Sequence, residues 1–300
     1  MKKSVIEIVN EKIIEKLEKG VNPWRKPWNY PTAKANPKNI AINYISNKAY
    51  NGINQVLLDS GYYLTFKQIQ EIGGHLKKGS KGEMVIYSAP TQYKTSETDP
   101  TTGEEIEETK NGFILKYYYV YKLEDVENYK PIKNRGENID STTYKTQTAE
   151  EIDNIINDYA KRSNLRVFIK NSNEAYYSPL LHKVVVPQVS QYKQQEEYYS
   201  TFFHELGHST GHSTLLNRDT LNTINHWGDN TYAKEELIAE ITSAYCLNYL
   251  GLENDKVLDN NVAYLQSWAK QLKNNTASYF ILNATTQATK AFKLIMNIQE

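Results

Sequence analysis

The sequence predicts an α+β protein of two domains, and three observations support this class. The 300 residues suffice for two ordinary domains, each able to bury its own core. A polar segment near the middle contains Pro131 and Gly136 and has no apolar periodicity. Beyond it, two short strands precede a helix with two histidines four residues apart, and further helices follow. We expect domains at residues 1–130 and 148–300, joined by a linker at 131–147.

The first domain is expected to be mixed α/β. Apolar residues recur at helical spacing from Val5 to Leu17, and Gly20 then ends an amphipathic opening helix. Residues 83–88 and 113–122 have the composition of strands. Residues 91–112 between them are rich in Thr, Glu and Lys and are expected to form a mobile hairpin tip.

The second domain opens with a helix that has an N-terminal capping signal. Thr148 is its expected N-cap, and Glu151, three residues on, completes a capping box. Two strands are expected next, at residues 165–170 and 183–186. The later helices are expected at about residues 194–208, 233–250, 262–273 and 276–296.

Composition narrows the cellular setting. Cys246 is the single cysteine, which excludes an internal disulfide framework and fits a reducing compartment. Charged residues interrupt the N-terminal apolar pattern, so it is not a signal peptide, and no run is long enough to cross a bilayer. We expect a cytoplasmic protein.

The net charge of zero conceals an asymmetry. Residues 1–90 hold 14 Lys and Arg against 7 Asp and Glu, and the remaining chain holds 21 against 28. The first part is a candidate for binding a polyanion, although a solvated surface with a chance excess of lysines fits equally well.

The most informative motif is the pair of histidines His204 and His208, with Glu205 directly after the first. On a helix, this spacing places both imidazoles on one face, where they can bind a single Zn2+. Glu205 would then lie beside a metal-bound water as general base. The pattern predicts a zinc hydrolase site, and its expected substrate is a peptide bond. A peptide could pair with the strand at residues 183–186 if that strand is an exposed edge.

A catalytic zinc needs a third protein ligand, and two residues compete for this role. Glu236 and Glu240 share a helix face, so Glu236 could bind the metal while Glu240 accepts the N–H of a ligating histidine. His212 follows His208 by four residues, but Gly211 indicates that the helix ends before it. We favour Glu236, since buried carboxylates need a partner.

The remaining acidic and histidine residues of this region have simpler interpretations. Glu235 is expected in a solvated first helical turn, favoured by the helix dipole. His75 and His182 are expected to be ordinary surface or packed histidines. His226 lies in a polar loop, and it could also close over the site as an electrophile.

Several motifs, taken in order, resemble those of the ArdC-type antirestriction proteins of conjugative elements. They are PWRKPW, YNGIN, LTFKQIQEIGGHLKKGSKG, FHELGHSTGH and YAKEELIAE, followed by a helix with Trp268. The resemblance implies a single-stranded-DNA-binding domain followed by a zincin-like metallopeptidase domain similar to SprT-type proteases. It also implies protection of incoming plasmid DNA from restriction, and host restriction or DNA-associated proteins as substrates. In zincins of the Glu-ligand type, a Glu-x-x-Ala/Ser-acid pattern supplies the third ligand, and Glu236 and Glu240 match it.

The resemblance suggests which residues of the basic part contact DNA. Aromatic faces stack on bases and cations follow the phosphates. The candidates are Trp24, Arg25, Lys26, Trp28, Lys77, Lys78 and Lys81. The two tryptophans could instead be core anchors of the opening helix, which we favour slightly for their rings.

Two function classes stay open. The protein is either an active protease that cuts a DNA-associated protein, or a binding module that shields single-stranded DNA and keeps a structural or vestigial zinc site.

Overall fold

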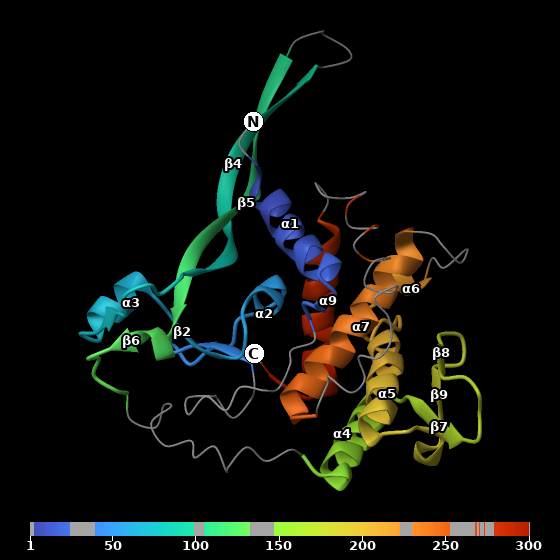
Figure 1. Cartoon of the computed structure of the whole chain (residues 1–300). Coiled ribbons are helices and arrows are strands. Elements are labelled where there is room, and N and C mark those ends of the chain that lie inside the picture. The colour runs from blue at the N-terminus through green and yellow to red at the C-terminus, as the bar shows by residue number, and fades with distance from the viewer. Residues whose placement is uncertain are drawn as a thin grey trace.

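The computed structural model describes residues 3–24, 40–98, 105–132, 147–222, 230–252, 268, 270, 273 and 279–299. Figure 1 shows a sheet-containing N-terminal part beside a mainly helical C-terminal part. The α+β class is therefore confirmed. The expected linker lies mostly outside the described residues, as does most of the helix expected at 262–273.

The N-terminal part is built on a four-stranded sheet in the order β1-β2-β5-β4. The two central strands pair antiparallel, and β1 joins β2 in parallel. The four strands are β1 (Ala41–Asn43), β2 (Gly61–Thr65), β4 (Glu83–Thr98) and β5 (Glu105–Lys122).

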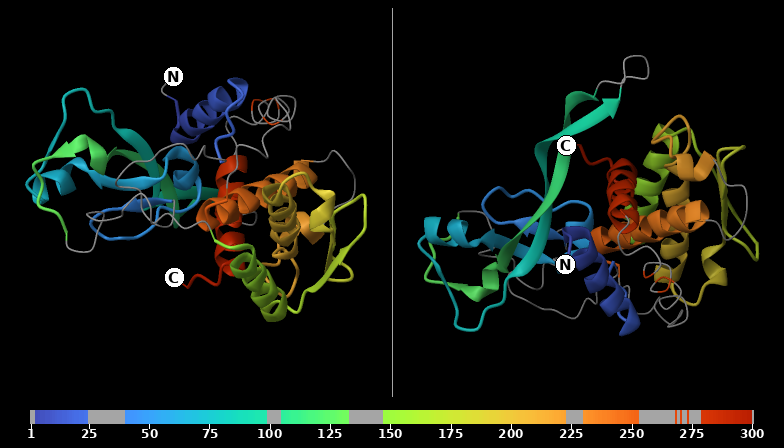
Figure 2. Two further views of the ribbon diagram at one scale, coloured as in Figure 1. Left: turned by 60° about the horizontal axis from the view of Figure 1, so that its bottom comes forward. Right: turned by 90° about the horizontal axis from the view of Figure 1, so that it is seen from above.

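The pairing of β4 with β5 is much longer than the sequence suggested. The two strands are in register from Glu83 opposite Val120 to Thr98 opposite Glu105. The expectation of a mobile tip over residues 91–112 was therefore wrong for most of that stretch. In Figures 1 and 2 this two-stranded ribbon extends beyond the other elements.

Smaller elements complete the N-terminal part. The opening helix α1 (Val5–Glu18) begins at a capping box in which the backbone N–H of Glu7 donates to Ser4 Oγ, and the Ser4 N–H donates to the Glu7 carboxylate. The other elements are α2 (Ile53–Leu57), α3 (Phe66–Glu71), β3 (His75–Leu76), the 3-10 turn η1 (Leu123–Asp125) and β6 (Val126–Glu127).

The C-terminal part combines a three-stranded sheet with helices. The order β7-β9-β8 makes β9 the central strand. The expectation that residues 183–186 could form an exposed edge was therefore wrong, because β7 and β8 occupy both edges of β9. The elements are α4 (Ala149–Arg162), β7 (Arg166–Lys170), β8 (Tyr176–Ser178), β9 (Lys183–Pro187), η3 (Val189–Gln191), α5 (Gln195–Ser209), α6 (Asp219–Asn222), α7 (Asn230–Leu250) and α9 (Phe280–Ile295).

One hydrophobic core joins the two parts of the chain. Ile13 and Leu17 of α1 are buried in the same cluster as Leu237 of α7 and Ile281 of α9. Trp24 is also fully buried in this cluster. In Figures 1 and 2, α1 accordingly lies against the C-terminal helices. A second core lies between α4, α5, α7 and the C-terminal sheet.

None of the described helices combines the length and the apolarity needed to span a bilayer.

Candidate metal centre

Helices α5 and α7 form the centre, and small residues bring them close together. A Cβ atom on Gly207 would lie 3.0 Å from the Ala239 Cα and 3.3 Å from the Thr242 Cβ. Both contacts are tighter than a side chain tolerates without a shift of the opposing helix. Gly207, between the two motif histidines, therefore sets the distance at which α7 residues can reach them.

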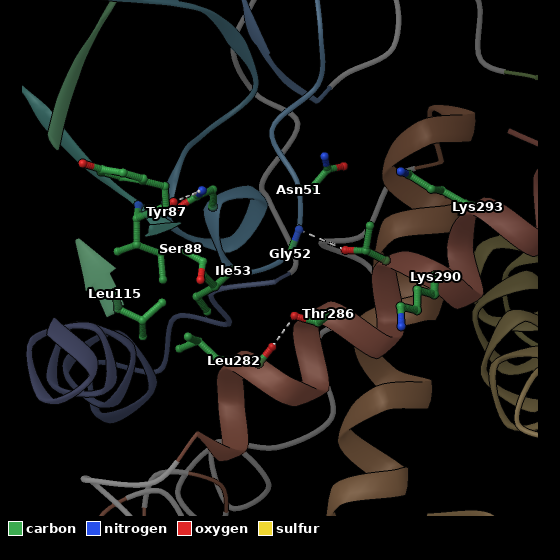
Figure 3. A pocket seen from close by; sticks show the side chains of 13 residues that line it. Asn51, Gly52, Ile53, Tyr87, Ser88, Leu115, Leu282, Thr286, Lys290 and Lys293 are labelled. Carbon is green, nitrogen blue, oxygen red and sulfur yellow. Dashed lines mark hydrogen bonds between the residues drawn. The ribbon is translucent and has the colours of Figure 1, made fainter. Parts of the chain in front are cut away.

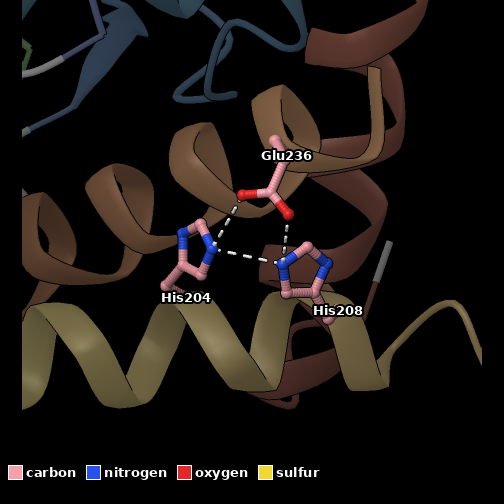
Figure 4. Close-up of side chains that lie close together, drawn as sticks. All are labelled: His204, His208 and Glu236. Atoms are coloured by element: carbon pink, nitrogen blue, oxygen red, sulfur yellow. Dashed lines mark hydrogen bonds and ion pairs between the residues drawn. The ribbon is translucent and has the colours of Figure 1, made fainter. Parts of the chain in front are cut away.

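Three predicted ligands converge where the helices meet. The Nε2 atoms of His204 and His208 lie 3.1 Å apart, and each lies 3.5 Å from one carboxylate oxygen of Glu236 (Figure 4). Within the described residues, this is the one group of three or more His, Cys, Asp or Glu side chains close enough to hold an ion.

The spacing of these atoms fits a small divalent cation. Bonds of about 2.0–2.2 Å at tetrahedral angles place donor atoms roughly 3.3–3.6 Å apart. The side chains of His204 and Glu236 keep 23% and 28% of their surface exposed. Solvent can therefore approach the centre, as a fourth ligand position requires.

Glu240 lies behind His204. One of its carboxylate oxygens is 3.8 Å from His204 Nδ1, an ion-pair distance. Burial opposes protonation of His204, but Glu236, Glu240 and Glu205 outweigh it and raise its pKa to about 10. A bound cation must therefore compete with a proton at this ring.

Glu235 lies behind His208, and here the sequence-based expectation was wrong. Its side chain is only 1% exposed rather than solvated. It faces His208 Nδ1 at 3.2 Å and accepts hydrogen bonds from Arg218 and from Thr220 Oγ1. Helical spacing offers a signal for this burial, because Glu235 shares a stripe with Ala239 and Thr242, which pack on Gly207.

Arg218 is the second residue of the centre that sequence reasoning missed. Its guanidinium donates to Glu235 and to the backbone oxygens of Gly207 and His208 in the last turn of α5. It also donates to Thr210 Oγ1 at 2.6 Å. A Cβ on Gly211 would lie 2.8 Å from this guanidinium. Gly211 thus makes room for the arginine that closes the helix end.

Glu205 and Tyr232 lie on the remaining side. Glu205 is buried directly after His204 on α5. The Tyr232 hydroxyl hydrogen-bonds Glu236, and burial together with the charges of Glu236 and Glu205 raises the pKa of Tyr232 to about 12. The hydroxyl thus stays protonated near neutral pH, which lets it act as a hydrogen-bond donor.

His212, the second candidate for third ligand, points elsewhere. Helix α5 ends at Ser209, and His212 Nδ1 lies 2.8 Å from Thr214 Oγ1. Its ring stacks on His182 with centroids 4.0 Å apart. His182 is held by Tyr177 and the Ser163 carbonyl, as expected for a packed histidine, and His226 lies outside the described residues.

The residues expected to contact DNA divide into three sets. Trp24 was an incorrect choice, because it is 0% exposed in the shared core and its ring cannot stack on a base. Arg25, Lys26 and Trp28 lie outside the described residues. Lys77, Lys78 and Lys81 are all exposed, and Lys77 Nζ donates to the Glu124 carbonyl.

A separate cavity of about 340 Å³ lies between α2, the base of the β4–β5 ribbon and α9 (Figure 3). Its walls are tied by hydrogen bonds between segments far apart in sequence. The Gly52 N–H donates to Thr289 Oγ1, and Asn54 pairs with both backbone groups of Ile86. The cavity thus marks a second place where the two parts of the chain meet.

Comparison with known proteins assigns both parts. Residues 3–121 match the N-terminal domain of anti-restriction factor ArdC, and residues 152–287 match the zincin-like metallopeptidase family. The chain combines an ArdC-type N-terminal domain with a zincin-like metallopeptidase domain. The similar solved structures include the antirestriction ArdC protein from the R388 plasmid. Its metal-free structure is 28% identical over 99% of both chains, with a TM-score of 0.71, and its Mn(II)-bound structure is 26% identical over 98% of both, with a TM-score of 0.70.

The curated relatives differ in length. The chain is 29% identical to two DNA primase TraC proteins of Escherichia coli, but it spans only 20% and 27% of their lengths. It is also 26% identical to the uncharacterized protein y4eC of Sinorhizobium fredii (strain NBRC 101917 / NGR234), over 96% of this chain and 89% of that one.

Proposed function

We propose that this protein is an antirestriction factor of a conjugative element that binds single-stranded DNA and hydrolyses peptide bonds in DNA-associated proteins. The observation that carries the proposal is the convergence of His204, His208 and Glu236 on one point between α5 and α7. The antirestriction part of the proposal is taken from the similar antirestriction ArdC protein of the R388 plasmid.

In this proposal His204, His208 and Glu236 hold a divalent cation, and Glu240 and Glu235 orient the two imidazoles from behind. We propose zinc, the metal that two histidines and one carboxylate commonly bind, although the related structure contains Mn(II). When bound, the cation supplies Lewis acidity toward a carbonyl oxygen and lowers the pKa of a water.

The chain's own side chains do the remaining chemistry. Glu205 accepts the proton of the attacking water and delivers it to the leaving amine. In this proposal the protonated Tyr232 hydroxyl turns from Glu236 and donates its hydrogen bond to the developing oxyanion. A peptide can pair with an edge strand of the C-terminal sheet, which here means β7 or β8.

The decisive experiment compares wild type with Glu205→Ala in a plasmid-transfer assay under restriction. Glu205→Ala should retain the cation and lose both peptide cleavage and protection. The matched control is Glu174→Ala, an exposed carboxylate outside the centre, which should change neither. Full protection by a Glu205→Ala protein that no longer cleaves would contradict the protease mechanism and favour DNA shielding.

A further inference from the structure

The β4–β5 ribbon carries an uncovered row of aromatic side chains with a cation among them. Because side chains alternate between faces, one face of the ribbon presents Tyr87, Tyr93, Ile114, Lys116 and Tyr118, here called the tyrosine face. All five are exposed; Tyr87, Tyr93 and Tyr118 keep 44%, 50% and 38% of their surface accessible.

The opposite face is partly covered where the ribbon meets the body of the protein, although Tyr117 and Tyr119 on this face stay exposed. Met84 and Ile86 belong to the core that joins the two parts of the chain, and Leu115 packs against it. The tyrosine face lies on the other side of the same two strands. Its aromatic rings are therefore not used to hold the ribbon on the C-terminal helices.

The rings are arranged in ways that leave aromatic surface accessible. Tyr87 and Tyr118 meet edge to face, with centroids 5.6 Å apart. The Tyr93 ring lies across Gly112 on the neighbouring strand, where an added Cβ would come within 2.7 Å of it. Because Gly112 has no side chain, the Tyr93 ring can pack directly against the backbone of the neighbouring strand. Tyr87 and Tyr93 are six residues apart on one strand, which corresponds to about 20 Å.

The middle stretch of the ribbon carries charge that favours a polyanion. Residues 84–94 and 110–120 contain three lysines and no Asp or Glu, whereas the acids of the two strands, Glu83, Glu97, Glu105, Glu107 and Glu108, lie toward their ends. Lys116 stands directly opposite Tyr87, and Lys110 directly opposite Tyr93. Aromatic rings interleaved with cations are the features that bind unpaired bases and their phosphates.

We infer that the tyrosine face is a binding surface for single-stranded nucleic acid, with bases stacked on Tyr87, Tyr93 and Tyr118 and a phosphate near Lys116. This inference rests on the DNA-binding part of the proposed function and gives it a location. It replaces Trp24, which is buried, as the source of stacking rings.

The test measures the affinity of the full chain for a fluorescent oligothymidylate of about 16 nucleotides over a series of salt concentrations. Tyr87→Ala/Tyr118→Ala should weaken binding at least about tenfold, since each stacked base contributes substantially. Tyr117→Ala/Tyr119→Ala removes two exposed tyrosines from the other face and should bind within about twofold of wild type. Thermal unfolding verifies that both variants are folded.

Two further measurements do not depend on the stability of the alanine variants. Lys116→Gln should reduce the slope of log affinity against log salt by about 0.7, whereas Lys94→Gln on the opposite face should not. Photo-crosslinking of wild type to an iododeoxyuridine oligonucleotide should label Tyr87, Tyr93 or Tyr118.

The outcomes separate this inference from the proposed function. If wild type binds the oligonucleotide and Tyr87→Ala/Tyr118→Ala binds equally well, the tyrosine face is not the binding surface, while the proposal that the protein binds DNA is retained. If wild type does not bind the oligonucleotide even at low salt, both the inferred binding surface and the DNA-binding part of the proposed function are contradicted. If the double variant keeps its DNA affinity but loses self-association in sedimentation, the face belongs to a second copy of the chain, which also overturns the inference.

Discussion

The guanidinium of Arg218 contacts both carboxylate oxygens of Glu235, with Nε to Oε2 at 3.0 Å and Nη2 to Oε1 at 2.5 Å. Arg218 and Glu235 are 4% and 1% exposed, so this pair lies in the interior beside the candidate metal centre. The same carboxylate faces His208 Nδ1. It favours the tautomer with a proton on Nδ1 and a lone pair on Nε2, which is the form that binds a cation.

The first prediction concerns the stability of this pair. Arg218→Met should lower the free energy of unfolding by about 3–5 kcal/mol, because it leaves Glu235 buried without its cation. The double variant Arg218→Met/Glu235→Met should cost less than Arg218→Met alone, since no unpaired charge remains. Urea unfolding of the metal-free proteins measures both.

A surface pair provides the control for that experiment. Lys19 and Glu15 form an exposed ion pair at 2.5 Å on α1. Lys19→Met should change stability by less than about 1 kcal/mol. A double variant that is less stable than Arg218→Met would contradict the interpretation of Arg218 as the partner of a buried charge.

The second prediction concerns the stability of the protein at acidic pH. Burial would raise the pKa of Glu235, but hydrogen bonds from His208 and Arg218, with the charges of both, outweigh it and lower the pKa from 4.5 to about 2. A folded-state pKa below the unfolded one stabilises the protein above pH 4.5, and the stabilisation is lost as the pH falls toward 2. Its size is of order 3 kcal/mol.

Glu235→Gln should therefore remove part of the acid sensitivity. Unfolding free energies at pH 7, 4.5 and 3 should fall less steeply for Glu235→Gln than for wild type. Glu174→Gln, an exposed carboxylate, should follow wild type. Parallel curves for wild type and Glu235→Gln would show that another group carries the acid response.

The third prediction concerns metal stoichiometry. His204→Ala, His208→Ala and Glu236→Ala should each abolish binding of one divalent ion per chain, because each removes one of the three converging donors. His212→Ala should retain it, since this ring stacks on His182. Elemental analysis of the dialysed proteins measures the metal content of each variant. Stoichiometric metal in all three variants would contradict the centre.

Protons should compete with the metal in a defined direction. The pKa of His204 is raised to about 10 in the metal-free protein, so the ring must lose a proton to become a ligand. Affinity for Zn2+ should rise as the pH increases from 6 toward about 9, and uptake should release protons into a weakly buffered solution. An affinity independent of pH over this range would contradict the raised pKa.

The sequence predicted those elements whose signals are local. The capping box of Thr148 and Glu151 formed as expected, with the Glu151 N–H donating to Thr148 Oγ1 and the Thr148 N–H to the Glu151 carboxylate. The convergence of Glu236 with His204 and His208 followed from helical spacing combined with the chemical needs of a metal. The capping signal lies within a few residues of the helix it predicts, and each half of the metal signal lies within one helix, although the two halves are far apart in the chain.

The features that were not predicted from the sequence depend on contacts between segments far apart in the chain. Residues 91–98 form a strand although they are polar, because a ribbon exposed on both faces needs no apolar alternation. Glu235 resembled a solvated residue because its cation, Arg218, comes from a loop 17 positions earlier. For Trp24 the sequence left both base stacking and a core anchor open, with a slight preference for the anchor, and the shared core with α7 and α9 residues confirms the anchor.

The last prediction tests whether the two parts of the chain unfold together. Leu17 of α1 is fully buried in the core that also contains Leu237 of α7. Leu17→Ala should cost about 2–5 kcal/mol. Because the core is shared, the variant should also speed hydrogen exchange at the backbone amides of α7, more than 200 positions away in the sequence.

Ile69→Ala is the matched control for Leu17→Ala. Ile69 is equally buried, but its cluster contains only residues of the N-terminal sheet and its neighbours. Ile69→Ala should speed hydrogen exchange at the backbone amides of β2 and α3. At an equal loss of stability, it should affect the amides of α7 less than Leu17→Ala does. Unchanged protection of α7 in Leu17→Ala would mean that the N-terminal helix rests on the metallopeptidase helices without supporting them. Faster exchange there would mean that the N-terminal part stabilises the helix carrying Glu235, Glu236 and Glu240, and so couples the two parts of the chain through a common core.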